Sequence, residues 1–283
     1  MSPRDLWPPP EVTESDWAMN PVSFARDALG FTPDAHQARI LTSPHSRGLL
    51  NCTRQWGKST IVALKAVHRG LFRSESMILV VNPSERQSRE FLRKAKRFVS
   101  RLKIPIRGDG DNQVSLQLPN GSRLVGIPGK EETVRGFSAV SLLLIDEAAR
   151  VSDEMYNSVT PMLAVGGGHL CLMSMPHGKR GFFNEAWMKG GNWTRISVKA
   201  TDCPRISKAF LEEQRKSMGD RWYRQEHLCE FHGSHTQLIP DHILERVFTT
   251  RVPPIDAAPR PHSPLSRPRT RAVRFATAGV RAG

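Results

Sequence analysis

The chain has 283 residues, of which 39% are hydrophobic and 24% charged, an ordinary composition for one large folded domain or two small ones. It contains no apolar run near the roughly 18–20 residues that cross a bilayer, no basic-then-apolar secretory signal, and four cysteines without a Cys-x-x-Cys pair, so neither a membrane protein, a disulfide framework nor a zinc site is indicated and we expect a cytoplasmic setting. The formal charge of +14 points to a polyanionic partner, because lysines and arginines release counterions when they bind nucleic acid.

At the N-terminus, the sequence predicts a Pro-rich extension over residues 1–22, followed by a short helical segment over 26–40 before the first core strand. Leu49 and Leu50 then form an apolar entry into the segment 51–60, and apolar residues at 61, 64 and 67 indicate a helix directly after it. The segment 51–60 is therefore expected to join a strand to a helix.

This segment matches most of the phosphate-binding pattern G-x-x-x-x-G-K-[ST]. In that pattern, backbone amides surround phosphate groups, the lysine contacts the β and γ oxygens, and the hydroxyl reaches Mg²⁺. Gly57, Lys58, Ser59 and Thr60 fit, but Cys52 stands where the first glycine belongs. The partial match by itself leaves an ordinary surface turn open. The strand and helix around it favour a nucleotide site, because the loop amides and the helix N-terminus stabilise an anion there.

A second motif lies downstream, where the apolar run 142–145 ends in Asp146 and Glu147. A buried parallel strand would deliver two carboxylates to the C-terminal edge of a sheet in this way, whereas a helix opened by acidic residues is the alternative. Together with the phosphate loop, the strand is favoured. Asp146 would then hold Mg²⁺, and Glu147 would polarise the attacking water as general base.

Strands and helices alternate over the middle of the chain. We expect strands at 77–81, 169–174 and 193–198, helices at 84–101, near 153–163 and near 182–188, and a hairpin over 116–124 around Asn120-Gly121. The alternation predicts an α/β fold with a mostly parallel sheet covered on both faces. Together with the phosphate-loop and acidic-strand motifs, it indicates the P-loop NTPase (RecA/ASCE-like) type. After residue 201 only helices are expected, at 207–218 and 220–230.

We therefore divide the chain into the extension 1–22, a P-loop ATPase domain 23–200, a small helical lid 201–248 and a basic, Pro- and Arg-rich tail 249–283. From Arg251 onward the tail has seven arginines against one aspartate and little apolar periodicity, so no packed core is expected there.

Four stretches in order resemble the ATPase domain of the large terminase subunit of tailed bacteriophages, the motor that drives DNA into a preformed head. The segment 54–59, Arg-Gln-Trp-Gly-Lys-Ser, is similar to the family's deviant phosphate loop R-Q-x-G-K-[ST], and Gln37 matches an upstream glutamine that reads adenine. Arg135-Gly136 precedes the acidic strand as in the family. The segment 174–178 is similar to the family's coupling motif small-x-Pro-x-Gly.

The resemblance implies ATP and Mg²⁺ as cofactors and assigns roles to particular residues. Arg54 or Arg135 would supply positive charge to the γ-phosphate in the transition state. Coupling would involve Ser174, Pro176 and Gly178, and Mg²⁺ would be held at Ser59 and Asp146. Nucleotide contacts would come from Gln37, Arg54, Gln55, Gly57, Lys58, Ser59 and Thr60. The alternatives are a solvated loop charge for Arg135, a strand-end residue for Ser174 and a helix cap or surface amide for Gln37.

The resemblance also implies partners: double-stranded DNA, the phage portal and small terminase subunit, a possible homo-oligomeric ring and no membrane, in the cytoplasm of the bacterial host. A complete large terminase continues into a nuclease, but the segment after 248 has one carboxylate, Asp256, and no apolar strand, so we expect no DNA cleavage. Two other hypotheses stay open: a helicase-like ATPase, which needs a second RecA-like domain, and an inactive prophage remnant.

Overall fold

A computed structural model describes residues 14–43, 46–109, 112–128 and 136–233, together with positions 243 and 247. Contacts within the chain group Met1–Gln237 into one compact unit and Leu238–Gly283 into another. The expected tail at 249–283 and Arg135 lie outside the described residues. Among the helices of the described ranges, none is both long and apolar enough to span a bilayer.

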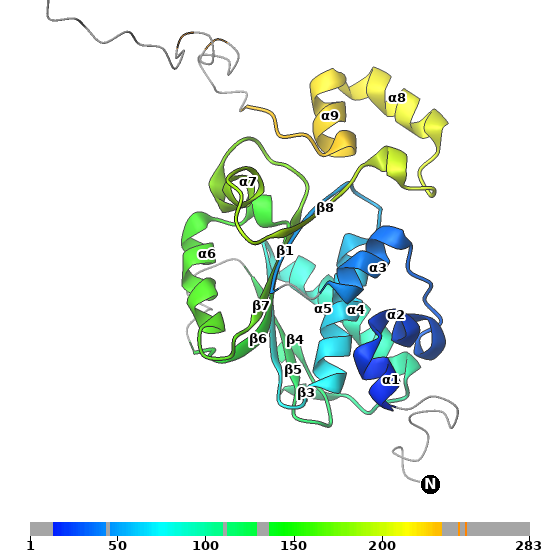
Figure 1. The fold of residues 1–283 in the computed structure, drawn as a ribbon, viewed down its shortest axis with the longest axis vertical. Coiled ribbons are helices and arrows are strands. Elements are labelled where there is room, and N and C mark those ends of the chain that lie inside the picture. The colour runs from blue at the N-terminus through cyan, green and yellow to red at the C-terminus, as the bar shows by residue number, and fades with distance from the viewer. Residues whose placement is uncertain are drawn as a thin grey trace, which may run out of the picture. The chain divides into compact units, whose positions relative to one another are not determined.

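Within the first unit, the described strands form one eight-stranded sheet of order β3-β4-β5-β2-β6-β7-β1-β8 (Figure 1). In this order, every pair of neighbours from β5 through β2, β6, β7 and β1 to β8 is parallel. At the other edge, β4 pairs antiparallel with β5, and β3 pairs antiparallel with β4. The expected, mostly parallel sheet and the hairpin at 116–124 are confirmed. The strands are β1 (Arg47–Cys52), β2 (Met77–Asn82), β3 (Arg107–Asp109), β4 (Asn112–Gln117), β5 (Arg123–Pro128), β6 (Val140–Asp146), β7 (His169–Ser174) and β8 (Thr194–Val198).

Helices cover both faces of the sheet, as expected (Figure 1). Successive residues of a strand point to opposite faces, so β6 sends Leu142 and Leu144 into one core and Leu143 and Ile145 into the other. The first core contains residues of α3 (Ala35–Thr42), α4 (Lys58–Phe72) and α5 (Glu85–Arg101), and the second those of α6 (Asp153–Val159) and α7 (Gly181–Met188). The apolar run 142–145 is therefore buried on both faces of the sheet.

Hydroxyl side chains fix where several helices begin. Ser84, Ser152 and Ser207 precede α5, α6 and α8 (Lys208–Met218), and each accepts a hydrogen bond from the backbone N–H three residues later. The helix expected near 153–163 is α6 followed by the 3₁₀ turn η5 (Thr160–Leu163), where Pro161 lacks the N–H that an α-helix would use.

The N-terminal part differs from the expected lead-in over 26–40. Three elements come before α3: the helices α1 (Glu14–Met19) and α2 (Pro21–Ser23) and the π-helix η2 (Phe24–Ala28). Gly30, with φ of 58°, lies in the non-helical segment between η2 and α3. Trp17 and Phe24 are 1% and 0% exposed, and their rings meet edge to face at 6.1 Å. Part of the expected extension thus belongs to the core, because Trp17 packs there. The domain boundaries themselves stay a prediction.

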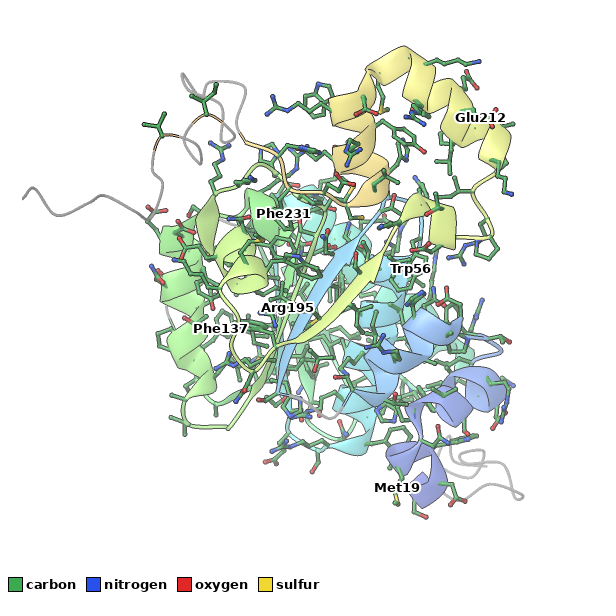
Figure 2. All side chains as sticks on the ribbon, turned by 45° about the horizontal axis from the view of Figure 1, so that its top comes forward. Met19, Trp56, Phe137, Arg195, Glu212 and Phe231 are labelled. Atoms are coloured by element: carbon green, nitrogen blue, oxygen red, sulfur yellow. The ribbon has the colours of Figure 1, made fainter. Side chains whose placement is uncertain are left out.

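The segment after β8 contains the 3₁₀ turn η6 (Ala200–Asp202), α8 and α9 (Asp220–Leu228), which we call the lid. Gly219, with φ of 76°, separates the two helices as expected. Ala200, Leu211 and Tyr223 are the buried residues of a small core of its own, and Figure 2 shows Glu212 on the outer side of α8. The lid is therefore a small helical layer held together by few apolar side chains.

Candidate functional site

The turn between β1 and α4 joins a strand to a helix, as expected, although Cys52 stands where the pattern has its first glycine. Cys52 is the last residue of β1, pairs with Val198 of β8 and is fully buried, so this position is an ordinary strand end that accepts a side chain. The left-handed residues are instead Gln55 and Gly57, with φ of 61° and 100°. The sharp turn is thus made at the second glycine of the pattern, where only glycine adopts such an angle freely.

The loop faces the acidic pair predicted at the end of β6. Lys58 Nζ donates to Glu147 Oε1 at 2.6 Å, and Ser59 Oγ donates to Asp146 Oδ2 at 2.9 Å. The two motifs are 87–89 residues apart in sequence, but β7 alone separates β1 from β6, so the carboxyl ends of the three strands lie at one edge of the sheet. The helix alternative for 142–147 is wrong.

Burial and charge act on these groups in opposite directions. Burial lowers the pKa of Lys58, but the charges of Asp146 and Glu147 and the hydrogen bond to Glu147 outweigh it, so the pKa lies above its usual value. Burial raises the pKa of Asp146 in spite of the opposing charge of Lys58. The ammonium is therefore held charged beside two carboxyl groups in a site largely withdrawn from water.

Glu147 itself has an unusual backbone. Its φ and ψ are 50° and 42°, the left-handed region, and its N–H donates to Asp146 Oδ1 at 2.9 Å. Such a conformation costs a residue with a Cβ on the order of 1–3 kcal/mol. The turn aims the Glu147 side chain back at Lys58, and strain of this kind is concentrated at functional sites.

The N-terminus of α4 is suited to an anion. Its N-cap is Gly57, which supplies no side-chain hydrogen bond, and the first turn of this 15-residue helix contains no acidic residue. Backbone N–H groups of a first helical turn have no partner within the helix and carry partial positive charge. The amide of Thr60 is the exception, because it already donates to Gly57 O at 3.0 Å. Together with Lys58, these groups fit a phosphate chain.

The same edge offers ligands to Mg²⁺, although only a few. Mg²⁺ takes hard oxygen ligands and is commonly bound by one or two carboxylates together with substrate phosphates. The Ser59 hydroxyl and the Asp146 carboxylate are such oxygens, already 2.9 Å apart. No group of three His, Cys, Asp or Glu side chains that could hold a metal occurs in the described ranges. The donor set fits a metal held jointly with phosphate.

Gln37 and Trp56 lie next to the loop. Gln37 is 2% exposed and forms a capping box with Asp34, in which Asp34 N donates to Gln37 Oε1 at 3.1 Å, while Gln37 Nε2 donates to Trp56 O at 3.5 Å. Trp56 is buried beside α3, where its Nε1 donates to Asp34 Oδ2 at 3.0 Å and its ring meets His36 (Figure 2). The structure thus shows the helix-cap arrangement of Gln37, and its adenine role stays a prediction.

The two predicted arginines have different outcomes. Arg54 is 61% exposed and forms an ion pair with Glu226 of α9, with Nε and Oε2 3.0 Å apart, so its side chain is directed to the lid in this structure. Arg135 lies outside the described residues. Neither of the proposed transition-state roles is tested by this geometry.

The coupling segment begins at the end of β7. Ser174 is fully buried, aligns with Asn51 of β1 and accepts a hydrogen bond from Ala149 N at 3.2 Å, just after the acidic pair. Pro176 and Gly178 follow in the turn before α7, and Gly178 has φ of 78°. Ser174 therefore ends the strand that lies between the phosphate-loop strand and the acidic strand, and its coupling role stays a prediction.

Three residues that the sequence analysis missed join the lid to the phosphate loop. Asn51 Nδ2 donates to Cys229 O at 2.8 Å, Thr53 Oγ1 donates to Glu226 O at 3.1 Å, and Arg205 donates to Trp56 O. Each acceptor is a backbone carbonyl, which carries no sequence signature, and the partners are 149–178 residues apart. The only signal in the sequence that the lid contacts the loop was the coupling motif at 174–178, which came from the family resemblance.

The fold and the site define a class of protein. A mostly parallel sheet that carries a phosphate loop after β1 and an acidic pair after β6, with one strand between them, is the RecA-like fold of P-loop NTPases.

Comparison with protein families narrows this class to one family. Residues 49–246 match the family described as "Terminase large subunit, T4likevirus-type, N-terminal", and the chain belongs to this family. A search of curated proteins gave no match.

Solved structures agree with the fold. The chain is similar to the large terminase ATPase domain of Thermus phage P74-26, with a TM-score of 0.68, 20% identity and coverage of 75% of this chain and 99% of that domain. It is also similar to the large terminase of a thermophilic bacteriophage in complex with ADP (TM-score 0.61, 16% identity, 70% and 53% covered). A third similar structure is the HK97 bacteriophage large terminase, with a TM-score of 0.63, 14% identity and coverage of 76% of this chain and 55% of that protein. The chain thus spans about half the length of these two larger proteins.

Proposed function

We propose that this chain hydrolyses ATP and uses the energy to move double-stranded DNA, as the motor part of a phage packaging terminase. The observation that carries the proposal is the pairing of Lys58 with Glu147 and of Ser59 with Asp146, at 2.6 and 2.9 Å, beside an uncapped helix N-terminus. Membership of the terminase large-subunit family supports it, and so does the solved complex of the thermophilic bacteriophage's large terminase with ATP-gamma-S.

Each side chain has a defined task in this proposal. Lys58 and the amides at the start of α4 bind the phosphates, with Gln55, Gly57 and Thr60 completing the loop, and Ser59 and Asp146 hold Mg²⁺. Mg²⁺ held there would supply positive charge to stabilise the phosphoryl oxygens as they become more negative. Lys58 Nζ turns from Glu147 to the phosphates, which releases Glu147 Oε1 to accept a proton from the attacking water.

The lid would transmit the result of hydrolysis. Ser174 touches the turn after the acidic pair, and Asn51 and Thr53 hold the end of α9 against the phosphate loop. A change at the phosphates therefore has a short route to the lid through β1 and through the segment 174–178. Arg54 or Arg135 would supply further positive charge in the transition state.

The partners follow from the family and from charge. The formal charge of +14 suits a polyanion such as duplex DNA, and assembly into a ring with a portal and a small terminase subunit is proposed by family resemblance.

Replacing the general base tests this function most directly. Glu147→Gln keeps the size of the side chain but removes its basicity, so ATP turnover in the presence of DNA should fall about 10²- to 10⁴-fold while ATP binding persists. Glu154→Gln, on the exposed start of α6, is the matched control and should hydrolyse ATP like the unaltered chain. Full turnover by Glu147→Gln would show that Glu147 is not the base.

A further inference from the structure

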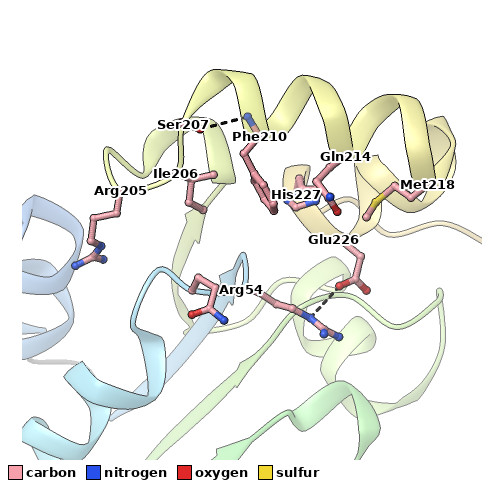
Figure 3. Close-up of a pocket in the computed structure, with 10 residues that line it drawn as sticks. Arg54, Arg205, Ile206, Ser207, Phe210, Gln214, Met218, Glu226 and His227 are labelled. Atoms are coloured by element: carbon pink, nitrogen blue, oxygen red, sulfur yellow. Dashed lines mark hydrogen bonds and ion pairs between the residues drawn. The ribbon is translucent and has the colours of Figure 1, made fainter.

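The lid and the phosphate loop meet at few points. A pocket of about 570 Å³ separates part of their facing surfaces, and two of the residues that line it, Arg54 and Glu226, form an ion pair across it (Figure 3). Outside this pocket, two side chains from β1 and the start of the loop hold the end of α9, because Asn51 donates to Cys229 O and Thr53 donates to Glu226 O. The position of the lid therefore depends on a small number of polar contacts.

Asn51 differs from Thr53 in having a second polar atom that is unused. The side chain is 2% exposed, its Nδ2 donates to Cys229 O at 2.8 Å, and its Oδ1 has no hydrogen-bond partner in the described part of the chain. Exchanging the two ends of the amide would not help, since Oδ1 would then face the Cys229 carbonyl, which is another acceptor. A buried acceptor without a donor is costly and rare in folded proteins, so this atom requires an explanation.

Ser174, on the neighbouring strand, carries a suitable donor. Asn51 and Ser174 are paired in the register of β1 and β7, and both point to the second core, because Leu49 and Leu172, two residues before them, belong to it. Ser174 is fully buried, and its Oγ accepts a hydrogen bond from Ala149 N at 3.2 Å. A hydroxyl group accepts and donates at the same time, so its hydrogen is available to Asn51 Oδ1.

Cys229 is the residue at which the chain leaves the lid. It ends α9 with φ of 59° and ψ of 34°, the left-handed region, which is strained for a residue with a Cβ. Its Sγ donates to Val198 O at 3.4 Å, and two residues further on Phe231 packs against Phe183 of α7 (Figure 2). Hinges are commonly a few residues at the end of an element that absorb a change in φ and ψ. The Asn51 amide thus holds the carbonyl of a residue placed as a hinge.

We infer that Asn51 is a positioning residue that links Ser174 to the lid, with Cys229 as the hinge. In one nucleotide state the Ser174 hydroxyl donates to Asn51 Oδ1, and the amide, fixed at both ends, holds Cys229 O more firmly. In the other state this bond is absent, as it is in this structure. The inference rests on the proposed function and adds to it the side chain that carries a change at 174–178 to α9, whereas Thr53 only fixes the lid.

Hydrogen exchange of the full chain, with ADP and with ATP-gamma-S in the presence of Mg²⁺, tests the inference. In the unaltered chain the amides at 227–231 should exchange about 2- to 10-fold faster with one nucleotide than with the other, the effect of one hydrogen bond. Ser174→Ala and Asn51→Ala should each remove most of this difference, and the double variant no more than either, because both delete the same bond. Asn51→Asp keeps the size but cannot donate to Cys229 O, so it should also lack the difference.

Thr53→Val is the matched control, because it removes one hydrogen bond to the same helix. Exchange at 227–231 should rise with both nucleotides, and the ratio between them should persist. If Asn51→Ala behaves in the same way, or if its effect on the ratio adds to that of Ser174→Ala, Asn51 only fixes the lid and the inference is wrong.

Ser174→Ala leaves every printed contact of the lid in place, so a ratio that persists in this variant overturns the inference even if the Asn51 variants fold poorly. An unaltered chain without a difference between the two nucleotides overturns it as well. In each of these cases, slow ATP turnover by Glu147→Gln beside normal turnover by the unaltered chain would leave the proposed ATPase function standing.

Discussion

The acidic edge of the sheet and the lid are held in place in very different ways. All seven residues of β6 are buried, and the polar groups at its end are paired with Lys58 and Ser59. The lid has three buried residues in its own core, and hydrogen bonds from Asn51, Thr53 and Arg205 join it to the loop. The difference teaches that the groups to which we assign the chemistry are fixed on a rigid layer, whereas the lid, to which we assign the response, rests on a few polar contacts.

Removal of an apolar side chain from each region gives the largest contrast. Leu144→Ala, in the middle of β6, should lower the global free energy of unfolding by about 2–5 kcal/mol, because the rigid sheet cannot close around the cavity. Leu211→Ala, in the lid core, should lower it less and should reduce hydrogen-exchange protection only in α8 and α9. Chemical unfolding together with hydrogen exchange measures both, and equal global losses would contradict the contrast.

The contact between β1 and α9 should have an intermediate effect. Asn51→Ala leaves the buried Cys229 carbonyl without its donor, at a cost of about 1–3 kcal/mol. The loss should appear as faster amide exchange in α9 with little change in the sheet. Asn157→Ala, at an exposed position of α6, provides the control. Exchange that accelerates equally in β6 would mean that the lid and the sheet open as one unit.

The ion pair between Arg54 and Glu226 should contribute least to stability. The side chains are 61% and 15% exposed, so water and salt screen the attraction, and Glu226→Gln should change the free energy of unfolding by only about 0–1 kcal/mol. Urea unfolding at low and at high salt would measure it. A loss as large as that of Asn51→Ala would show that charge, and not the backbone contacts, holds the lid.

Local patterns made much of the sheet predictable. The apolar run 142–145 with two acids after it favoured a strand buried on both faces over a helix, once the phosphate loop indicated a sheet edge. The helix beginnings at Ser84 and Ser207 were equally visible in the sequence. Even the cap formed by Asp34 and Gln37 follows a known pattern, and it was open as an alternative to the adenine role.

The contacts of the lid were not predictable in the same way. Asn51, Thr53 and Arg205 donate to backbone carbonyls of residues more than a hundred positions away, and any residue type supplies such an acceptor. Trp56 is buried through a hydrogen bond to Asp34 and a ring contact with His36, which lie just before and within α3. Long-range packing of this kind has no period or spacing in the sequence.

The left-handed turn at Glu147 has a consequence for engineering this protein. Glycine would relax the backbone there, and protein designers who select for heat resistance alone would favour it, yet the exchange would delete the carboxylate that we assign to catalysis. Thermal stability and ATP turnover thus favour different residues at position 147. A thermostable version of this enzyme should be sought at positions remote from that turn.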